Sequence, residues 1–289
     1  MSTTGRPLHL HEDRLFPSDP TQRAIARRLY SQVEGLPIIS PHGHTDPAWF
    51  AGNASFANAT ELLLVPDHYV FRMLYSQGID LDELGIPRAD GSRAAVDPRQ
   101  AWRLFARNFH LFRGTPSSLW LNHVFHEVFG LRVRLDAGTA DHYYDTITAA
   151  LQDEAFRPRA LFERFDIEVI ATTEGPLDPL VHHQAIRDSD WKGKVVTAYR
   201  PDEVVDPEHE AFAAALERFG AITGEDVYTW DGYLRAHRNR RAFFRSLGAT
   251  STDHGHESAL TADLSRAEAE RLFAKILKGG FSRQEAALF

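Results

Sequence analysis

The chain has 289 residues and a formal net charge of −8, from 32 lysines and arginines against 40 aspartates and glutamates. This length suits two average domains or one barrel-sized domain, since (β/α)8 barrels typically take about 250 residues. The absence of cysteine excludes disulfides, thiolate metal sites and a cysteine nucleophile. The acidic balance argues against a nucleic-acid surface, and no apolar run approaches the roughly 20 residues that span a membrane. The N-terminus lacks the apolar core of a signal peptide, so we expect a soluble, cytoplasmic protein.

The first 44 residues are expected to form an extended arm, one helix and one strand. The helix is predicted to begin after Asp19, which can cap it ahead of a proline at the first helical position. Residues 36–40 (LPIIS) form a short apolar run that predicts a buried strand. The predicted buried face of the helix consists of Ile25, Leu29 and Val33.

Residues 45–165 are rich in aromatic side chains and show helical patterns but no convincing strand. Helices predicted to start at Pro98 and Pro116 each follow a residue that can cap them. Another helix is predicted over residues 141–152. A stretch of about 120 residues with apolar faces of its own is too long for a loop, so we expect a helical insertion here.

From residue 166 onward, predicted strands alternate with predicted helices. Strands are expected over residues 167–173, 194–199 and 249–252. Helices are expected over residues 178–187 and twice between 207 and 247, with Gly248 ending the last of them. Regular alternation of strands and helices favours an α/β fold with parallel strands.

Two more helices are predicted near the end of the sequence, each opened by a capping box. Ser265 pairs with Glu268, and Ser282 pairs with Glu285. The second helix would have about two turns and shows no stop signal. With only four strands predicted, we expect the chain to be part of a longer protein. Because its sheet edges would stay unpaired, we expect the isolated chain to be insoluble or molten and inactive, which a cooperative thermal transition would contradict.

His42 and His44 directly follow the first predicted strand, in a His-Gly-His sequence. Side chains two residues apart leave an extended chain on the same side, about 6.6 Å apart along it. Two imidazoles placed in this way can share one divalent ion, for which Zn²⁺ is the first candidate. A lone His-x-His pair is more often an ordinary polar pair. Its position at the carboxyl end of a strand favours the metal interpretation, because active sites of (β/α)8 barrels lie there.

All four predicted strands are followed by polar side chains. Helix capping or solvation can account for each group taken alone. Because the carboxyl ends of parallel strands meet at one edge of a sheet, four such endings favour a shared pocket. Besides the two histidines, the groups are Thr172, Thr173 and Glu174, then Arg200 and Asp202, and finally Asp253, His254 and His256.

Other polar residues have simpler structural explanations. Asp67 is predicted to cap a helix in which Tyr69 packs. The arginines between residues 235 and 245 are expected to form a solvated helix face. His182 and His183 are expected on a helix surface, whereas His123 and His126 are expected to pack within an aromatic-rich helix.

Several segments together resemble the uronate isomerases, a divergent branch of the amidohydrolase superfamily. The matching segments, in the family's order, are PIISPHGHTDP, PDHYVFRMLYSQG, RPRALFERFDIEVIATTEGP, VVTAYRPD and GATSTDHGHE. The resemblance implies an α/β fold, the first part of a (β/α)8 TIM barrel of the metal-dependent hydrolase type. It also implies a large helical insertion after strand one. The domains would then be residues 1–44 (arm, helix and strand one), 45–165 (insertion) and 166–289 (continuing barrel).

The resemblance also implies an activity and a set of site residues. Family members interconvert an aldehyde uronate with its ketose, for example D-glucuronate with D-fructuronate. His42 and His44 match their strand-one ligands for a divalent metal. Arg200 matches an arginine that holds the sugar acid, and Asp253 matches an aspartate that faces the site and is expected to be catalytic. Tyr69 matches a tyrosine near the substrate, expected to bind it and handle hydroxyl protons, and His68 beside it is expected to bind substrate.

The sequence departs from the family pattern in three respects. The family often carries a second acidic residue after the two threonines, where this chain has Gly175 after Glu174. His254 and His256 replace apolar residues. Family members are also longer, and their later portion carries a further histidine, the aspartate that completes the metal site, and an arginine. The resemblance therefore covers roughly the first three fifths of the family.

The chemistry of aldose–ketose isomerisation requires a base, polarised oxygens and a clamp that orients the substrate. Arg200 could grip a carboxylate with two parallel hydrogen bonds, and a metal on the two histidines could bind sugar oxygens. Two other functions stay open: a metal-dependent hydrolase on the same barrel, and a non-catalytic relative that binds sugar acids or a partner. The expected ligand is a small sugar acid, with no nucleic acid or membrane, and a homo-oligomer is left open.

Overall fold

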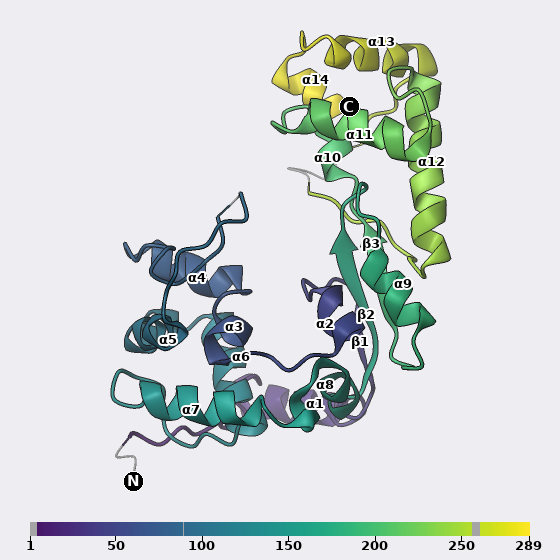
Figure 1. The fold of residues 1–289 in the computed structure, drawn as a ribbon. Helices are drawn as coiled ribbons and strands as arrows, with labels where there is room; N and C mark the ends of the chain where they lie inside the picture. Colours follow the sequence, from purple (N-terminus) through teal and green to yellow (C-terminus); the bar gives the residue numbers. More distant parts are fainter. Residues whose placement is uncertain (1–4, 89, 256–260) are drawn as a thin grey trace. The chain divides into compact units, whose positions relative to one another are not determined.

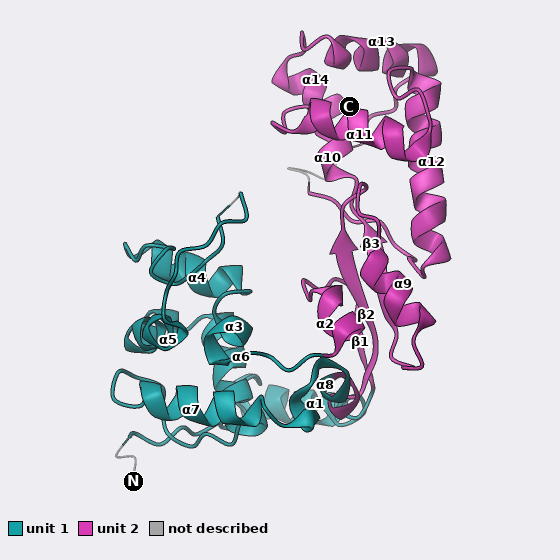
Figure 2. Cartoon of the chain, in the orientation of Figure 1, with its two compact units in different colours: residues 1–36, 54–161 teal, residues 37–53, 162–289 magenta. Residues whose placement is uncertain are grey.

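The computed structural model describes residues 5–88, 90–255 and 261–289. The chain divides into two compact units, each built from two stretches of sequence (Figure 2). The first unit comprises Met1–Leu36 and Ala54–Leu161, and the second comprises Pro37–Asn53 and Phe162–Phe289. Figure 1 labels their helices and strands.

The first unit is helical, and several of its helices begin where the sequence predicts. The side chains of Asp19, Asp97 and Thr115 each accept a hydrogen bond from a backbone N–H in the first turn of the helix that follows. These three predicted caps are therefore confirmed. The helical elements are α1 (Pro20–Tyr30), α3 (Ala59–Leu63), α4 (His68–Tyr75), α5 (Pro98–Arg107), η1 (Phe109–Phe112), α6 (Pro116–His123), η2 (Val124–Val128), α7 (Ala140–Ala150) and η3 (Glu154–Phe156), and α8 (Pro158–Arg164) crosses into the second unit.

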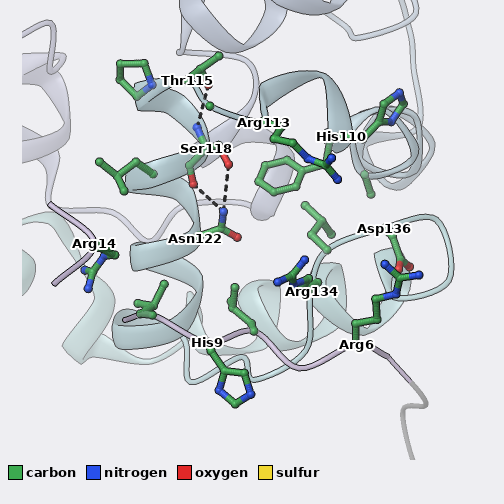
Figure 3. A pocket seen from close by; sticks show the side chains of 18 of the residues that line it. Arg6, His9, Arg14, His110, Arg113, Thr115, Ser118, Asn122, Arg134 and Asp136 are labelled. Carbon is green, nitrogen blue, oxygen red and sulfur yellow. Dashed lines mark hydrogen bonds between the residues drawn. The ribbon is translucent and has the colours of Figure 1, made fainter. Parts of the chain in front are cut away.

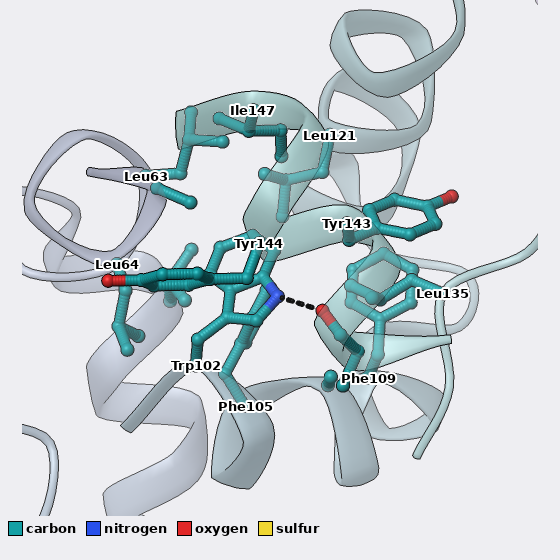
Figure 4. Packing of buried hydrophobic residues seen from close by; sticks show 14 of the residues in the cluster. Leu63, Leu64, Trp102, Phe105, Phe109, Leu121, Leu135, Tyr143, Tyr144 and Ile147 are labelled. Atoms are coloured by element: carbon teal, nitrogen blue, oxygen red, sulfur yellow. Dashed lines mark hydrogen bonds between the residues drawn. The ribbon is translucent and has the colours of Figure 1, made fainter. Parts of the chain in front are cut away.

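The core of the first unit surrounds Trp102, which is fully buried (Figure 4). Its indole Nε1 donates a hydrogen bond to the carbonyl oxygen of Ala140, with the two atoms 3.0 Å apart, and so links α5 to α7. Phe105 and Phe109 are also buried, as the helical periodicity predicts. The aromatic-rich block therefore has a continuous core of its own.

Replacing Trp102 with alanine is expected to lower the free energy of unfolding by about 3–5 kcal/mol, because a large cavity replaces a fully buried ring. The variant also leaves the Ala140 carbonyl without its donor. Urea denaturation of the purified protein measures the effect. Trp120→Ala, at a side chain that is 36% exposed, is the matched control and should cost less than half as much. Equal losses would contradict the assigned core.

Two sequence predictions of burial are wrong. α1 has no buried residue, and Ile25 and Leu29 are 45% and 63% exposed, while Val33 lies beyond the end of the helix. Ile38 and Ile39 of strand β1 (Ile38–Ser40) are exposed as well, since among the described residues β1 forms an edge of the sheet and pairs with β2 alone. A periodic apolar pattern identifies the face to be covered but does not identify what covers it.

The second unit contains three parallel strands in the order β1–β2–β3, which confirms the α/β class. Strand β2 (Ile167–Glu174) is central, and β3 (Val195–Tyr199) is buried along its whole length. The predicted fourth strand, residues 249–252, is wrong as a strand, because only one parallel bridge joins Thr252 to Tyr199. The helices of this unit are α2 (Pro47–Gly52), α9 (Val181–Asp188), α10 (Asp202–Val205), α11 (Phe212–Thr223), α12 (Trp230–Ser246), α13 (Arg266–Leu277) and α14 (Arg283–Leu288).

In the second unit, the predicted C-terminal end of α12 and the predicted N-terminal ends of α13 and α14 are confirmed. Gly248 follows α12 with a φ of +97°, a conformation that glycine adopts without strain. The capping boxes of Ser265 with Glu268 and of Ser282 with Glu285 are both formed. No helix in the described part of the chain combines the length and apolar composition needed to cross a membrane.

Candidate active site

The carboxyl ends of the strands are aligned by a short chain of backbone hydrogen bonds. The N–H of Gly43 donates to the carbonyl of Ala171 on β2 at 2.7 Å. The N–H of Arg200 donates to Glu174, and that of Asp253 donates to Tyr199, each at 3.1 Å. One edge of the sheet therefore carries four neighbouring segments. They are the loop after β1, the ends of β2 and β3, and the segment after Thr252.

The glycine between the two histidines is required by this alignment. A Cβ atom at Gly43 would lie 3.3 Å from the carbonyl oxygen of Ala171, closer than side chains usually approach a backbone oxygen. A side chain here would need a small shift of the loop or of β2. Glycine therefore allows His42 and His44 to follow the strand end closely.

Five side chains meet at this edge, and we call them the carboxyl-edge cluster: His42, His44, Arg200, Asp202 and Asp253. Atom Oδ2 of Asp253 lies 3.0 Å from Nδ1 of His42 and 3.3 Å from Nε of Arg200. The Nε2 atoms of the two histidines are 3.1 Å apart. Asp202 accepts a hydrogen bond from the N–H of Gly255 at 2.6 Å. All five residues were predicted as strand-end groups of a shared pocket, and the structure brings them close together.

Three polar atoms of the carboxyl-edge cluster are buried without a hydrogen bond within the described ranges: Nε of Arg200, Oδ2 of Asp202 and Oδ2 of Asp253. Nε of Arg200 lies at ion-pair distance from both carboxylates, 3.8 Å from Oδ2 of Asp202 and 3.3 Å from Oδ2 of Asp253, without a hydrogen bond to either. A buried polar group without a hydrogen bond costs about 1–3 kcal/mol. Such a group is typical of a site that binds a polar ligand.

The two histidines are compatible with a shared metal ion. Two Zn–N bonds of about 2.05 Å at a tetrahedral angle hold the nitrogens about 3.3 Å apart, close to the observed 3.1 Å. Asp253 is placed beside Nδ1 of His42, where a carboxylate commonly orients a metal-binding histidine. Among the residues that the structure describes, no three histidine, aspartate or glutamate side chains form a complete metal site.

A second polar network lies at the end of β2. Thr172 and Glu174 were predicted as strand-end groups of the shared pocket, whereas Thr197 and His183 were not predicted as part of a site. Glu174 is only 10% exposed and accepts hydrogen bonds from the hydroxyls of Thr172, at 2.8 Å, and Thr197. Nε2 of His183 lies 2.9 Å from the Thr172 hydroxyl oxygen. Burial raises the pKa of the Glu174 carboxyl and lowers the pKa of the His183 imidazole.

The sequence analysis was wrong to place His183 on the surface, since it is 2% exposed. It shares the buried face of α9 with Ile186, three residues further along. That i, i+3 spacing was the available signal, because residues three apart lie on one face of a helix. His182 is exposed, as predicted.

The raised pKa of Glu174 predicts a pH-dependent stability. Above the ordinary carboxyl pKa of 4.5, the unfolded chain loses a proton that the folded chain keeps, so the free energy of unfolding falls as the pH rises through this window. Glu174→Gln retains an oxygen acceptor for the threonines but removes the titration. We expect the difference in melting temperature, Glu174→Gln minus wild type, to increase with pH. The increase should be about 2–4 °C for each kcal/mol of unfolding free energy that the wild type loses.

Thermal unfolding between pH 4 and 8 measures this difference. Glu168→Gln, at an exposed glutamate of the same strand, is the matched control and should follow the wild type at every pH. Parallel curves for Glu174→Gln and wild type would contradict the prediction.

Tyr69 and His68 belong to α4 in the first unit, whereas the carboxyl-edge cluster belongs to the second. Asp67 caps α4 as predicted, because its side chain accepts hydrogen bonds from the N–H groups of Tyr69 and Val70. The prediction that Tyr69 packs is wrong, since its side chain is 68% exposed. The rings of His68 and Tyr69 lie 4.2 Å apart. His256 lies outside the described residues.

Two other structural expectations need correction. Arg240 is not part of a solvated face, because its guanidinium donates hydrogen bonds to the carbonyls of Pro176 and Asp178 at 2.8 and 2.6 Å. It thereby fixes the loop that follows β2. His126 is partly buried, but His123 is exposed and lies 3.1 Å from a guanidinium nitrogen of Arg14, so it does not pack in a core.

These features define an α/β protein in which two histidines, an arginine and two aspartates meet at the carboxyl edge of a parallel sheet. The chain belongs to the glucuronate isomerase family, whose model matches residues 19–288. The resemblance identified from the sequence is therefore confirmed.

Relatives and solved structures agree with this assignment. A uronate isomerase of Xanthomonas campestris pv. campestris (strain B100) is 76% identical over 98% of the chain and 60% of its own length. A uronate isomerase of Phenylobacterium zucineum is 66% identical over 98% of the chain and 59% of its own length. The crystal structure of glucuronate isomerase from Caulobacter crescentus is 61% identical, with a TM-score of 0.93 over 98% of this chain and 59% of that one. The chain thus spans about 60% of the length of these relatives.

Proposed function

We propose that the protein is a uronate isomerase, which interconverts D-glucuronate and D-fructuronate by moving a proton between neighbouring carbons. Membership of the glucuronate isomerase family supports this proposal. The observation that carries it is the carboxyl-edge cluster, in which three buried polar atoms make no hydrogen bond within the described ranges. A sugar acid carries the hydroxyl and carboxylate groups that could satisfy such atoms.

We also propose that the sheet is the first part of a (β/α)8 barrel of the amidohydrolase type. The parallel order β1–β2–β3, followed by the bridge to Thr252, agrees with sequential strands around a barrel. In a flat sheet, four strands would separate the first from the last by about 14 Å, three spacings of about 4.8 Å. His42, which follows β1, nevertheless lies 3.0 Å from Asp253, which follows Thr252. A curved sheet brings these short side chains together.

His42 and His44 would hold a divalent metal, for which Zn²⁺ is the first candidate. The bound ion would polarise sugar oxygens as a Lewis acid. Oδ2 of Asp253 lies at ion-pair distance, 3.0 Å, from Nδ1 of His42, and Nε2 of His42 lies 3.1 Å from Nε2 of His44. A carboxylate in this position would help to hold the His42 imidazole as a metal ligand.

Arg200 would bind the substrate carboxylate. Its Nε faces Asp253, and its two terminal NH2 groups have no partner among the residues that the structure describes. These two groups can form parallel hydrogen bonds to one carboxylate, which orients the sugar for reaction. The nearby Asp253 would accept or return a hydroxyl proton.

Tyr69 and His68 are proposed as further substrate-binding residues, as the family resemblance implies. The Tyr69 side chain is exposed, so its phenol is accessible to a ligand. We assign both residues to substrate binding and Tyr69 also to proton handling at a sugar hydroxyl. The protein would act in the cytoplasm on a small sugar acid.

The direct test is turnover of D-glucuronate by the purified protein, expressed at the length its gene encodes. Proton NMR would follow D-fructuronate formation with and without added Zn²⁺. Absence of the ketose under both conditions would reject the proposal. Hydrolysis of a sugar lactone without isomerisation would indicate a metal-dependent hydrolase. Calorimetric binding of D-glucuronate without turnover would indicate a non-catalytic relative.

A further inference from the structure

The first unit contains a hollow of about 930 Å³ that is lined only by its own residues (Figure 3). This volume falls in the range of small-molecule pockets, about 300–1,000 Å³. The N-terminal segment forms one wall because it pairs with the segment before α7. The N–H of Leu8 donates to Arg132 at 2.8 Å, and the N–H of Arg134 donates to Arg6 at 2.7 Å.

The lining of this hollow is strongly basic although the whole chain is acidic. It contains five arginines and two histidines but only one carboxylate, that of Asp136. Asp136 is already engaged, since its Oδ1 accepts hydrogen bonds from the N–H groups of Gly138 and Thr139. The five arginines are Arg6, Arg14, Arg107, Arg113 and Arg134.

None of the five arginines forms an ion pair with a carboxylate anywhere in the described ranges, whereas arginines elsewhere in the chain commonly do. Arg14 donates to the carbonyl of His11 and approaches His123, and Arg134 donates to the carbonyl of Pro7. The backbone carbonyls position these two guanidinium groups without cancelling their charge. All five arginines are exposed, and none of their guanidinium groups is paired with a carboxylate in the described ranges, so they are accessible to an anionic ligand.

Polar groups of α6 add hydrogen-bonding capacity to the same hollow. Asn122 and Ser118 are joined by hydrogen bonds of 2.7 and 3.1 Å, shown as dashed lines in Figure 3. Leu8 and Phe109 supply apolar surface beside them. The lining thus offers charge, hydrogen bonds and apolar contact together, the mixture found in sites for organic ligands.

We propose that this hollow binds a small organic polyanion with at least two phosphate or carboxylate groups. Guanidinium groups recognise both kinds of anion through paired hydrogen bonds. Five unpaired arginines provide more positive charge than a single carboxylate, such as that of a uronate, requires. The inference does not depend on the proposed isomerase activity.

Isothermal titration calorimetry at about 0.15 M salt tests the proposal with two probes, pyrophosphate and citrate, since weak surface attraction is screened there. We expect saturable one-to-one binding of at least one probe, at least ten-fold tighter than binding of inorganic phosphate or D-glucuronate. Preference for pyrophosphate would identify a phosphate ligand, and preference for citrate would identify a carboxylate ligand.

The variant that tests the site is the double substitution Arg107→Gln with Arg113→Gln, because neither side chain makes a hydrogen bond or ion pair in the described part of the protein. We expect it to weaken probe binding at least ten-fold with an unchanged thermal transition. Arg28→Gln, at an exposed arginine of α1 outside the hollow, should bind as the wild type does. No probe binding to the wild type, or equal binding by the double variant, would overturn the proposal.

Discussion

Arg200→Lys is expected to lower kcat/KM for D-glucuronate by about 10- to 100-fold, the effect of losing one charge-assisted hydrogen bond of about 1.5–3 kcal/mol. Lysine keeps the positive charge, and so keeps an ion pair with Asp253 within reach. It cannot form two parallel hydrogen bonds to one carboxylate, which the planar guanidinium can. The loss therefore measures orientation of the sugar acid rather than charge alone.

Initial rates across a range of D-glucuronate concentrations measure this effect. The matched control is Arg235→Lys on α12, whose Nε lies 2.7 Å from a Glu225 oxygen in an exposed ion pair. The control should keep kcat/KM within about two-fold, since exposed ion pairs contribute little. If Arg200→Lys also stays within two-fold, Arg200 does not hold the substrate.

His42→Ala is expected to have the largest effect of all, the loss of bound metal together with at least 100-fold in kcat/KM. The substitution removes one of two imidazoles whose Nε2 atoms lie 3.1 Å apart, so the remaining site offers a single nitrogen. Asp253→Asn keeps both ligands but removes the carboxylate beside Nδ1 of His42. It should weaken metal affinity by about 10- to 100-fold, as replacement of such orienting carboxylates typically does.

Metal content after gel filtration gives a readout that is independent of turnover. Inductively coupled plasma mass spectrometry measures it. His182→Ala removes an exposed histidine of the same unit and should leave the metal content unchanged. A His42→Ala protein that retains wild-type metal would exclude His42 as a ligand. Activity without any bound metal in the wild type would exclude the metal from the reaction.

Local sequence signals determined much of the fold, because they act over a few residues. Asp19, Asp97 and Thr115 cap their helices since a short oxygen-bearing side chain satisfies a free N–H of the first turn. The two capping boxes near the C-terminal end of the sequence formed for the same reason. These interactions need no distant partner and can be predicted from spacing alone.

Predictions that required a distant partner failed more often. Ile25 and Leu29 lie on a periodic apolar stripe but are exposed, and β1 is an edge strand rather than a buried one. Residues 249–252 have a strand-like composition but make only one bridge. A strand forms only when its backbone hydrogen-bonds to a neighbouring strand. The sequence of the strand alone does not show whether that neighbour is present.

The sequence by itself determined the α/β class, the family, and the residue types that follow the strand ends. Chemistry-bearing side chains can be recognised by type and by their position after an apolar run. The His-Gly-His segment and Arg200 were identified in this way. The helical block with its aromatic core was also recognisable, because its amphipathic pattern repeats every three to four residues.

Only the tertiary structure decided which of these side chains meet. Sheet pairing places Asp253 against both His42 and Arg200, although they are separated by more than fifty residues along the chain. The tertiary structure also buries Glu174 with His183. In the helical first unit, it gathers five arginines around one hollow of an acidic protein. Distances and burial depend on how the backbone folds over long separations. The positions after the strands did predict a shared pocket for His42, Arg200 and Asp253. Charge counts and local periodicity carry no information about long separations, so the individual distances, the burial of His183 and the grouping of the arginines could not be predicted.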